Sequence, residues 1–229
     1  MIIADNVKRV RAEIAEAAAK SGRGPKDITL VAAAKQNAAE SVREAVLAGV
    51  DAVGENRAQE LAEKSSQGAY EGAPVHFIGH LQTNKVGAVV GRCSLIESVD
   101  SLRLLESVSR RARLLGIRQD VLLEVNIGGE SSKSGVLPGE LDPLLEFAAA
   151  ESGLRVLGLM AIPPVFAPNG SSRYFFDEMY RLFVDMRGKK YDNVDMRLLS
   201  MGMSSSFIDA IHSGSNMVRV GTAIFGGRA

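Results

Sequence analysis

Short apolar runs alternate with helix-like segments along the whole chain, and this alternation limits the folds that the chain can adopt. The runs contain little polar alternation, as is typical of parallel strands covered on both faces. Alternation alone fits a doubly wound open sheet as well as a closed barrel. The number of runs favours a (β/α)8 barrel, a TIM-like α/β fold, because eight are present: 28–34, 52–53, 75–78, 94–96, 120–125, 156–160, 196–199 and 217–220.

An additional helix is expected before the first strand. Ile3, Val7, Val10 and Ile14 form one apolar helical stripe, and charged residues occupy the opposite face. A length of 229 residues is usual for a single barrel domain, so residues 1–229 are interpreted as one domain. The stretch 163–172, which is rich in Pro, Asn, Gly and Ser, predicts a surface loop too short to divide the chain.

The composition argues against several classes of protein. The 27 basic and 27 acidic residues give a net charge of zero, which disfavours broad binding to nucleic acid or to an anionic membrane. No apolar run approaches the ~20 residues that span a bilayer, and the first residues lack the pattern of a signal peptide. Cys93 is the single cysteine, and its apolar neighbours predict a buried strand thiol. We therefore expect a cytoplasmic protein, and we expect it to be a monomer.

Polar or small residues follow the predicted strands, at the edge where the active sites of β/α barrels gather. Lys35 directly follows the first strand, where its amine is placed to attack an aldehyde. Part of this pattern has a simpler origin, because strand ends turn polar to begin loops and to cap helices. That origin does not explain why an amine, several amides and a glycine-rich segment occur together. The residues at the strand ends are Lys35, 54–56, His80, Gln82, Glu97, Asp100, Asn126, Met160, Ser200, Met203, Ser204 and 221–222.

Two segments near the C-terminus predict a phosphate site. Residues 200–206 contain several serines and lead into a short helix, where hydroxyl and N–H groups bind anions. After the last strand, Gly221 permits close approach of the backbone, and Thr222 offers an N–H group and a hydroxyl. Each segment alone is more simply a cap or a turn, but β/α barrels often bind phosphate at these two loops. Arg219 either pairs with the phosphate through its planar fork or forms a structural ion pair, and we favour the phosphate.

An amine and a phosphate site at one barrel mouth point to one ligand, an aldehyde that carries a phosphate. Asn56 either donates a hydrogen bond to such a ligand or caps the next helix, and its spacing does not distinguish the two roles. His80 is more simply explained as a residue with satisfied hydrogen bonds than as a catalyst. No spacing among the histidines and acids suits a metal ion, so no metal site is expected.

Eight sequence segments, in order along nearly the whole chain, are similar to those of the pyridoxal 5′-phosphate (PLP) homeostasis proteins, which are relatives of the barrel domain of alanine racemase. The segments are LVAAAK (30–35), GENRAQE (54–60), HFIGHLQTNK (76–85), EVNI (124–127), SKSG (132–135), GLMAIP (158–163), SMGMS (200–204) and VRVGTAIFG (218–226).

This resemblance implies a fold-type III barrel that holds PLP on Lys35 as an internal aldimine. It also implies specific neighbours of the cofactor: phosphate contacts from Ser204, Arg219, Gly221 and Thr222, and proximity of Asn56, Met201 and His80. Two features depart from the family pattern and affect local hydrogen bonding. Ala34 and Gln36 flank the lysine where the family usually has hydroxyl residues, and Ser206 stands where many members carry an acid.

The family's usual role is to bind PLP and to supply it to apo-enzymes without turnover. A racemase needs an acid and a base on opposite faces of the cofactor, and alanine racemase adds a C-terminal β-domain and a tyrosine opposite the lysine. Here the chain ends just after the last strand, and its tyrosines fall in predicted helices or loops: Tyr70, Tyr174, Tyr180 and Tyr191. We therefore expect a PLP carrier with no catalytic residues. An amino-acid racemase and a Schiff-base aldolase for phosphorylated sugars remain as alternatives.

Overall fold

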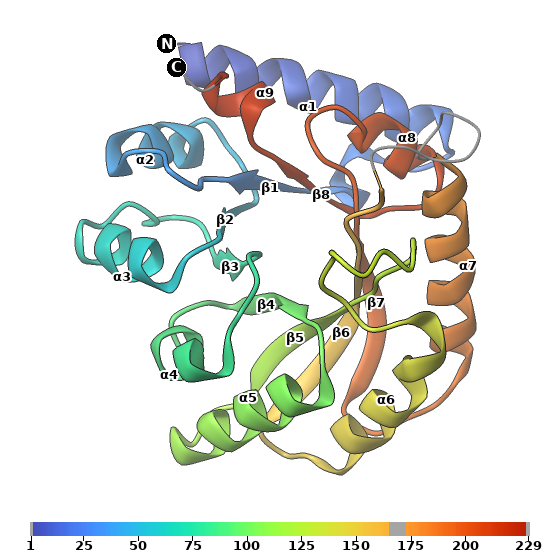
Figure 1. The fold of residues 1–229 in the computed structure, drawn as a ribbon. Helices are drawn as coiled ribbons and strands as arrows, with labels where there is room; N and C mark the ends of the chain where they lie inside the picture. Colours follow the sequence, from blue (N-terminus) through green and yellow to red (C-terminus); the bar gives the residue numbers. More distant parts are fainter. Residues whose placement is uncertain (1, 165–172, 228–229) are drawn as a thin grey trace.

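Eight parallel strands form a closed barrel in which each strand pairs with its neighbours in sequence and the last strand pairs with the first (Figure 1). The structure, a computed structural model, describes residues 2–164 and 173–227. The (β/α)8 prediction is confirmed, and the open-sheet alternative is wrong. The strands are β1 (Thr29–Ala33), β2 (Ala52–Glu55), β3 (Val75–Phe77), β4 (Leu95–Val99), β5 (Gln119–Glu124), β6 (Leu154–Met160), β7 (Val194–Ser200) and β8 (Met217–Val220).

The pairing of β1 with β8 closes the barrel and decides which residues meet at its mouth. Thr29 lies opposite Met217, and Ala32 lies opposite Val220. Because the two strands run in parallel and in this register, the segments that follow them leave the barrel at the same end. Lys35 and Gly221 therefore emerge side by side although they are far apart in sequence.

Helices surround the barrel, as the alternation of segments predicts. Helix α1 lies across α8 and α9 on one side of the barrel (Figure 1), and the predicted stripe of α1 is buried there through Val7, Val10 and Ile14. The helices are α1 (Ile2–Lys20), α2 (Ala39–Leu47), α3 (Ala58–Ser66), α4 (Val86–Val89), α5 (Leu102–Leu114), α6 (Leu141–Ala150), α7 (Arg173–Gly188), α8 (Phe207–His212) and α9 (Thr222–Phe225), with short 3-10 turns η1 (Pro25–Asp27), η2 (Thr83–Lys85) and η3 (Pro138–Glu140).

Two local predictions differ from the structure or fall outside it. Cys93 is buried as expected, but it lies in the turn before β4 and not in a strand. Most of the predicted loop 163–172 lies outside the described residues.

The interior of the barrel contains an apolar cluster and buried charged side chains. Seven side chains from six strands form a cluster that is separate from the core under the helices: Val31, Ala52, Leu95, Leu122, Leu157, Met160 and Met217. The strand residues Glu97, Glu124 and Arg219 are also buried. Burial of charge without pairing is costly, so these three side chains depend on the contacts described below.

Candidate functional site

A cavity of about 400 Å³ opens at the C-terminal ends of β1 and β8. It brings Lys35 together with Gly221 and Thr222, three of the residues singled out from the sequence. The side chains of Lys35 and Thr222 are exposed, and Gly221 is half-buried. The remaining lining residues are Ala33, Gln36, Asn37, Phe225, Gly226 and Gly227. A primary amine thus shares one mouth with the start of α9.

Ser204 joins the loop after β7 to the loop after β8. Its hydroxyl oxygen accepts hydrogen bonds from the backbone N–H groups of Gly221, at 3.1 Å, and Ala223, at 3.3 Å. These two N–H groups point at one oxygen acceptor, which is the arrangement that an anionic oxygen also needs. The serine-containing loop and the glycine-containing loop therefore form one polar surface beside Lys35.

The loop after β7 approaches α8 closely because residue 202 is a glycine. Its φ is +97°, in the region that favours glycine. A Cβ atom at this position is expected to lie 2.6 Å from Cβ of Ala210 and 2.9 Å from Cα of Phe207. The carbonyl oxygen of Gly202 also accepts the N–H of Arg219 at 3.0 Å, which fixes the loop against β8. Ser206, one of the departures from the family pattern, accepts the N–H of Met203 at 3.2 Å.

A buried ion pair supports the turn that contains Lys35. Lys64, on α3, donates to the carbonyl oxygen of Ala34 at 2.9 Å and to the Glu55 carboxylate at 2.8 Å. Glu60 accepts the N–H of Gln36 at 2.8 Å and lies 3.4 Å from Lys64 Nζ. Gln36, the other departure beside the lysine, has a φ of +62°, which is uncommon for a residue with a side chain.

Burial and hydrogen bonding act in opposite directions on the pKa of the Glu55 carboxyl. Burial raises its pKa, and the hydrogen bond and charge of Lys64, with a bond from Tyr70, offset only part of that effect. From the sequence, Glu55 stood out only as part of a strand-end segment, and Lys64 was not among the predicted site residues. The available signal was weak, because a Glu–Lys spacing of four on a helix is usually a solvated surface pair.

Asn56 and His80 line a different cavity from Lys35, of about 570 Å³, between the segments that follow β2 and β3. His80 is exposed and pairs with Asp100 at 3.0 Å. The Asn56 Oδ1 atom is buried without a hydrogen-bond partner among the described residues. Gly79 lets the two segments pack, since a Cβ there is expected 2.2 Å from the Asn56 carbonyl oxygen.

Arg219 lies inside the barrel, beneath the mouth. Its guanidinium donates to the Ser200 hydroxyl at 2.5 Å and to the Ala161 carbonyl at 2.9 Å, and it lies 3.8 Å from the Glu97 carboxylate. Arg219 therefore forms the structural ion pair considered from the sequence, and its contact with a phosphate stays a prediction. Met201, a further predicted neighbour of the ligand, is fully buried in the core.

Glu97 is the centre of this interior network. It accepts from the Ser200 hydroxyl at 2.6 Å and lies 2.7 Å from Nδ1 of His76. Burial alone raises the pKa of the Glu97 carboxyl, but the hydrogen bond and charge of His76, with Arg219 and Ser200, hold it below its usual value. Glu124 is different: burial, together with the charge of Asp100, raises its pKa to about 7.

The next features concern metal ligands, membrane-spanning helices and tyrosines in the described part of the chain. Within residues 2–164 and 173–227, no group of three or more His, Cys, Asp or Glu side chains is arranged to hold a metal ion. In the same residues, no helix has the length and apolar character that a membrane span requires. No tyrosine is among the described residues that line the Lys35 cavity.

Comparisons with known proteins identify the family. The family model described as "Alanine racemase, N-terminal domain" matches residues 5–229. The pyridoxal phosphate homeostasis protein of Aquifex aeolicus is 39% identical, with 98% of this chain and 97% of the relative covered, and that of Escherichia coli K12 is 40% identical, with 99% and 97% covered. The structure of PipY from Synechococcus elongatus with PLP bound has a TM-score of 0.81 at 31% identity and covers 93% of this chain and 100% of PipY. The chain therefore belongs to the alanine racemase N-terminal domain family and, within it, to the pyridoxal phosphate homeostasis proteins.

Proposed function

We propose that this protein binds PLP at the Lys35 mouth, holds it through a Schiff base on Lys35 and delivers it to apo-enzymes. The observation that carries the proposal is the convergence of the Lys35 amine and the Gly221–Thr222 backbone at one cavity of about 400 Å³, with the Ser204 hydroxyl bonded to the N–H of Gly221. An amine reacts with an aldehyde, and convergent N–H and hydroxyl groups bind a phosphate. The PLP-bound structure of PipY supports the same ligand.

Ser204 supports the placement of the phosphate. Its oxygen accepts the N–H groups of Gly221 and Ala223, which leaves its own O–H to donate to a phosphate oxygen in that region. Thr222 adds an exposed hydroxyl on the same side. We assign phosphate binding to Ser204, Gly221 and Thr222.

Arg219 is reassigned from the phosphate to the floor of the mouth, because its guanidinium is buried among Ser200, Ala161 and Glu97. PLP supplies an aldehyde and an electron sink, and the strength of that sink depends on the partner of the ring nitrogen. An arginine can donate a hydrogen bond there but does not give up a proton. A floor of this kind favours holding the cofactor over activating it.

The non-enzymatic role rests on what surrounds Lys35. Racemisation needs a second acid or base opposite the lysine, and no tyrosine is among the described residues that line the cavity. The relatives are named homeostasis proteins and not enzymes. We propose further that the protein is cytoplasmic. We also propose that it is monomeric, since a closed barrel offers no free strand edge for pairing with a second copy.

Absorbance tests the proposal. Protein reconstituted with PLP is expected to show a band near ~420 nm, which belongs to the bound cofactor, and Lys35→Ala is expected to lose it. Lys85→Ala is the matched control, because Lys85 lines the second cavity, with Asn56 and His80. Borohydride reduction followed by peptide mass spectrometry locates the attachment. Loss of the band in Lys85→Ala but not in Lys35→Ala contradicts the assignment, and a protein that never binds PLP contradicts the function.

Two further measurements separate a carrier from an enzyme. Loaded protein mixed with a PLP-dependent apo-enzyme is expected to restore that enzyme's activity even when a scavenger removes free PLP. Exchange of the α-proton of alanine with deuterated solvent is expected to stay at the rate of free PLP. Catalytic exchange supports the racemase alternative instead.

A further inference from the structure

The second cavity, of about 570 Å³, is separate from the Lys35 mouth and plays no part in the function proposed there. It lies between the residues that begin α3 and the stretch from Phe77 to Ala88, which leads from β3 into α4. Sites for small molecules are concave, have volumes in this range and combine apolar surface with a few polar groups. The second cavity has both kinds of surface.

The apolar surface of the second cavity comes mainly from three half-buried alanines. Ala58 and Ala62 are four residues apart, so they lie on one face of α3, and Ala88 belongs to α4. Phe77 and Leu81 line the cavity as well and are almost fully buried. Because alanine side chains are short, the space between these two helices stays open to an apolar ligand.

The charges that line the second cavity are all of one sign. Arg57 comes just before α3 and Lys85 just before α4, and no Asp or Glu is among the described residues that line the cavity. Arg57 lies 3.7 Å from Glu60, which compensates part of its charge. Lys85 Nζ has no hydrogen bond or ion pair within residues 2–164 and 173–227. One positive charge therefore remains without an opposite charge, which favours an anion with a single charge.

Uncharged polar groups complete the lining. The His80 ring is held through Nδ1, which lies 3.0 Å from Asp100 and 3.3 Å from the Ser134 hydroxyl. Its Nε2 atom and the side-chain amides of Gln59 and Gln82 have no hydrogen-bond partner in the described part of the chain. Amide N–H groups donate to carboxylate oxygens, so these side chains add donors beside the two cations.

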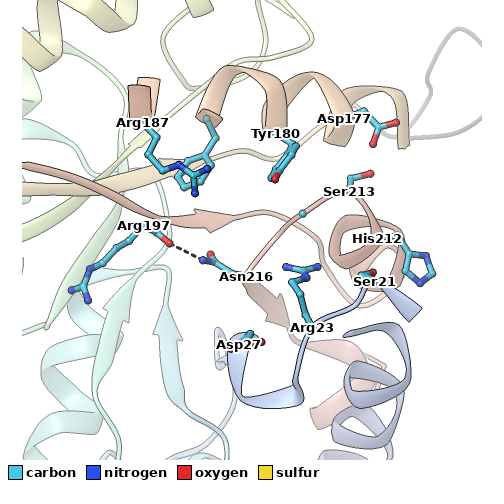
Figure 2. A pocket seen from close by; sticks show the side chains of 12 residues that line it. Ser21, Arg23, Asp27, Asp177, Tyr180, Arg187, Arg197, His212, Ser213 and Asn216 are labelled. Atoms are coloured by element: carbon cyan, nitrogen blue, oxygen red, sulfur yellow. Dashed lines mark hydrogen bonds between the residues drawn. The ribbon is translucent and has the colours of Figure 1, made fainter. Parts of the chain in front are cut away.

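Another cavity of about 570 Å³, beside α7, lacks this one-sided charge (Figure 2). Asp27 and Asp177 line it together with Arg23 and Arg187. Arg23 already donates to two backbone carbonyl oxygens. The charges there do not favour an anion, in contrast to those of the second cavity.

Helix α3, which forms one wall of the second cavity, is fixed by contacts on another of its faces. Lys64 donates to the Ala34 carbonyl oxygen at 2.9 Å, and Glu60 accepts the N–H of Gln36 at 2.8 Å. A wall that is already held in place lowers the entropy lost when a ligand binds.

We propose that the second cavity binds a small monocarboxylate with an apolar body. Lys85 neutralises the carboxylate, and Arg57 and the glutamine amides donate further hydrogen bonds to its oxygens. The apolar body covers Ala58, Ala62 and Ala88 and removes their surface from water. This site does not depend on the function proposed for the Lys35 mouth.

Nuclear magnetic resonance of the 15N-labelled protein tests the site, with phenylacetate as the probe. Phenylacetate is expected to shift the amide resonance of Gly87, next to the lining residue Ala88, in a saturable way. Phenylacetamide has the same ring without the charge, and acetate has the charge without the ring. Each of these two is expected to bind at least about 10-fold more weakly, because each loses one of the two contributions.

Four variants locate the binding. Lys85→Gln is expected to weaken it about 3- to 10-fold by removing the unpaired cation. Lys8→Gln makes the same change of charge at an exposed lysine of α1 outside the cavity and is expected to have no effect. Ala62→Leu is expected to fill the cavity and abolish binding, and leucine is a good helix former, so α3 is retained. Lys35→Ala is expected to bind phenylacetate as the unmodified protein does, whether or not the protein binds PLP.

Several results overturn the proposal. One is a Gly87 resonance that does not respond to phenylacetate, and another is equal binding of phenylacetate and phenylacetamide. Unchanged binding in both Lys85→Gln and folded Ala62→Leu, or a response confined to Gly221 at the Lys35 mouth, also contradicts the site. Tighter binding of phenyl phosphate than of phenylacetate contradicts a singly charged ligand.

Discussion

Lys64 Nζ lies 2.9 Å from the carbonyl oxygen of Ala34, the residue immediately before Lys35. The same ammonium contacts the buried carboxylate of Glu55 at 2.8 Å. A helix of the outer layer thus reaches under β1 and fixes the backbone from which Lys35 extends. The position of the Lys35 amine depends on an ion pair whose two residues do not line the cavity.

Lys64→Met is expected to destabilise the fold by about 3–5 kcal/mol, because it leaves the Glu55 carboxylate buried without its cation. Urea unfolding measures this loss. The double variant Glu55→Gln with Lys64→Met is expected to recover part of it, since no buried charge then remains. PLP affinity is expected to fall in both variants, because the Ala34 carbonyl loses its donor. Equal affinity in both variants and the unmodified protein contradicts the positioning role.

The raised pKa of Glu124 is expected to make the stability of the fold depend on pH. Its pKa is raised from 4.5 to about 7 in the folded state, so the folded chain binds this proton more tightly than the unfolded chain does. The contribution of Glu124 is therefore fully present below pH 4.5 and is lost as the pH rises through about 7. The loss amounts to roughly 3 kcal/mol. Glu124→Gln is expected to lack this part of the decline in urea unfolding between about pH 5 and 8; parallel curves for the two proteins contradict the assignment.

Gly202→Ala is expected to cost roughly 2 kcal/mol or more, because a Cβ atom meets Ala210 and Phe207 at a positive φ. The displaced loop carries Ser204, so phosphate affinity at the mouth is expected to fall as well. Gly87→Ala serves as the control, since it lies in α4 with open space around it. That substitution is expected to be neutral or to stabilise by up to about 1 kcal/mol. Thermal unfolding and PLP titration of both variants provide the comparison.

Glu97→Gln is expected to destabilise the barrel by about 3–5 kcal/mol, because Arg219 then stays buried without a carboxylate at 3.8 Å. The position of the guanidinium beneath the mouth is expected to change with it. In the PLP-loaded variant, the absorbance maximum is therefore expected to shift relative to the unmodified protein. An unchanged spectrum in a folded variant shows that Arg219 does not depend on Glu97.

Cys93 is expected to be inert to thiol reagents in the folded protein. Burial raises the pKa of its thiol to about 12, so the reactive thiolate is scarce at neutral pH. Titration with a chromogenic disulfide is expected to give one thiol per chain in denaturant and a much slower reaction without it. Fast reaction of the native protein contradicts the burial.

Much of the fold could be predicted because the strands carry their own signal. The run 217–220 coincides with β8, and 120–125 lies within one residue of β5 at each end. Parallel strands covered on both faces are apolar throughout, so the runs stand out against helices that have one polar face. The signal was weakest for Cys93, because apolar neighbours indicate burial but do not distinguish a turn from a strand.

The candidate site was predictable only in part. Lys35, Gly221 and Thr222 could be placed together because the ends of parallel strands meet at one edge of a barrel. The same argument placed Asn56 and His80 at that edge. It did not predict that the edge is divided into two cavities. The role of Arg219 was ambiguous, because its position in a strand does not show which buried carboxylate its side chain faces.

The sequence by itself determined the barrel, the edge that carries the polar residues and the family to which the chain belongs. These follow from local apolar patterns and from ordered motifs, which are properties of neighbours along the chain. Only the tertiary structure decided that Lys64 supports the Lys35 turn and that Glu97 holds Arg219 inside the barrel. It also decided that Arg23, Arg187 and Ser213 border one cavity. Such relationships join residues distant in sequence, so they exist only after the barrel closes and burial makes each unpaired charge costly.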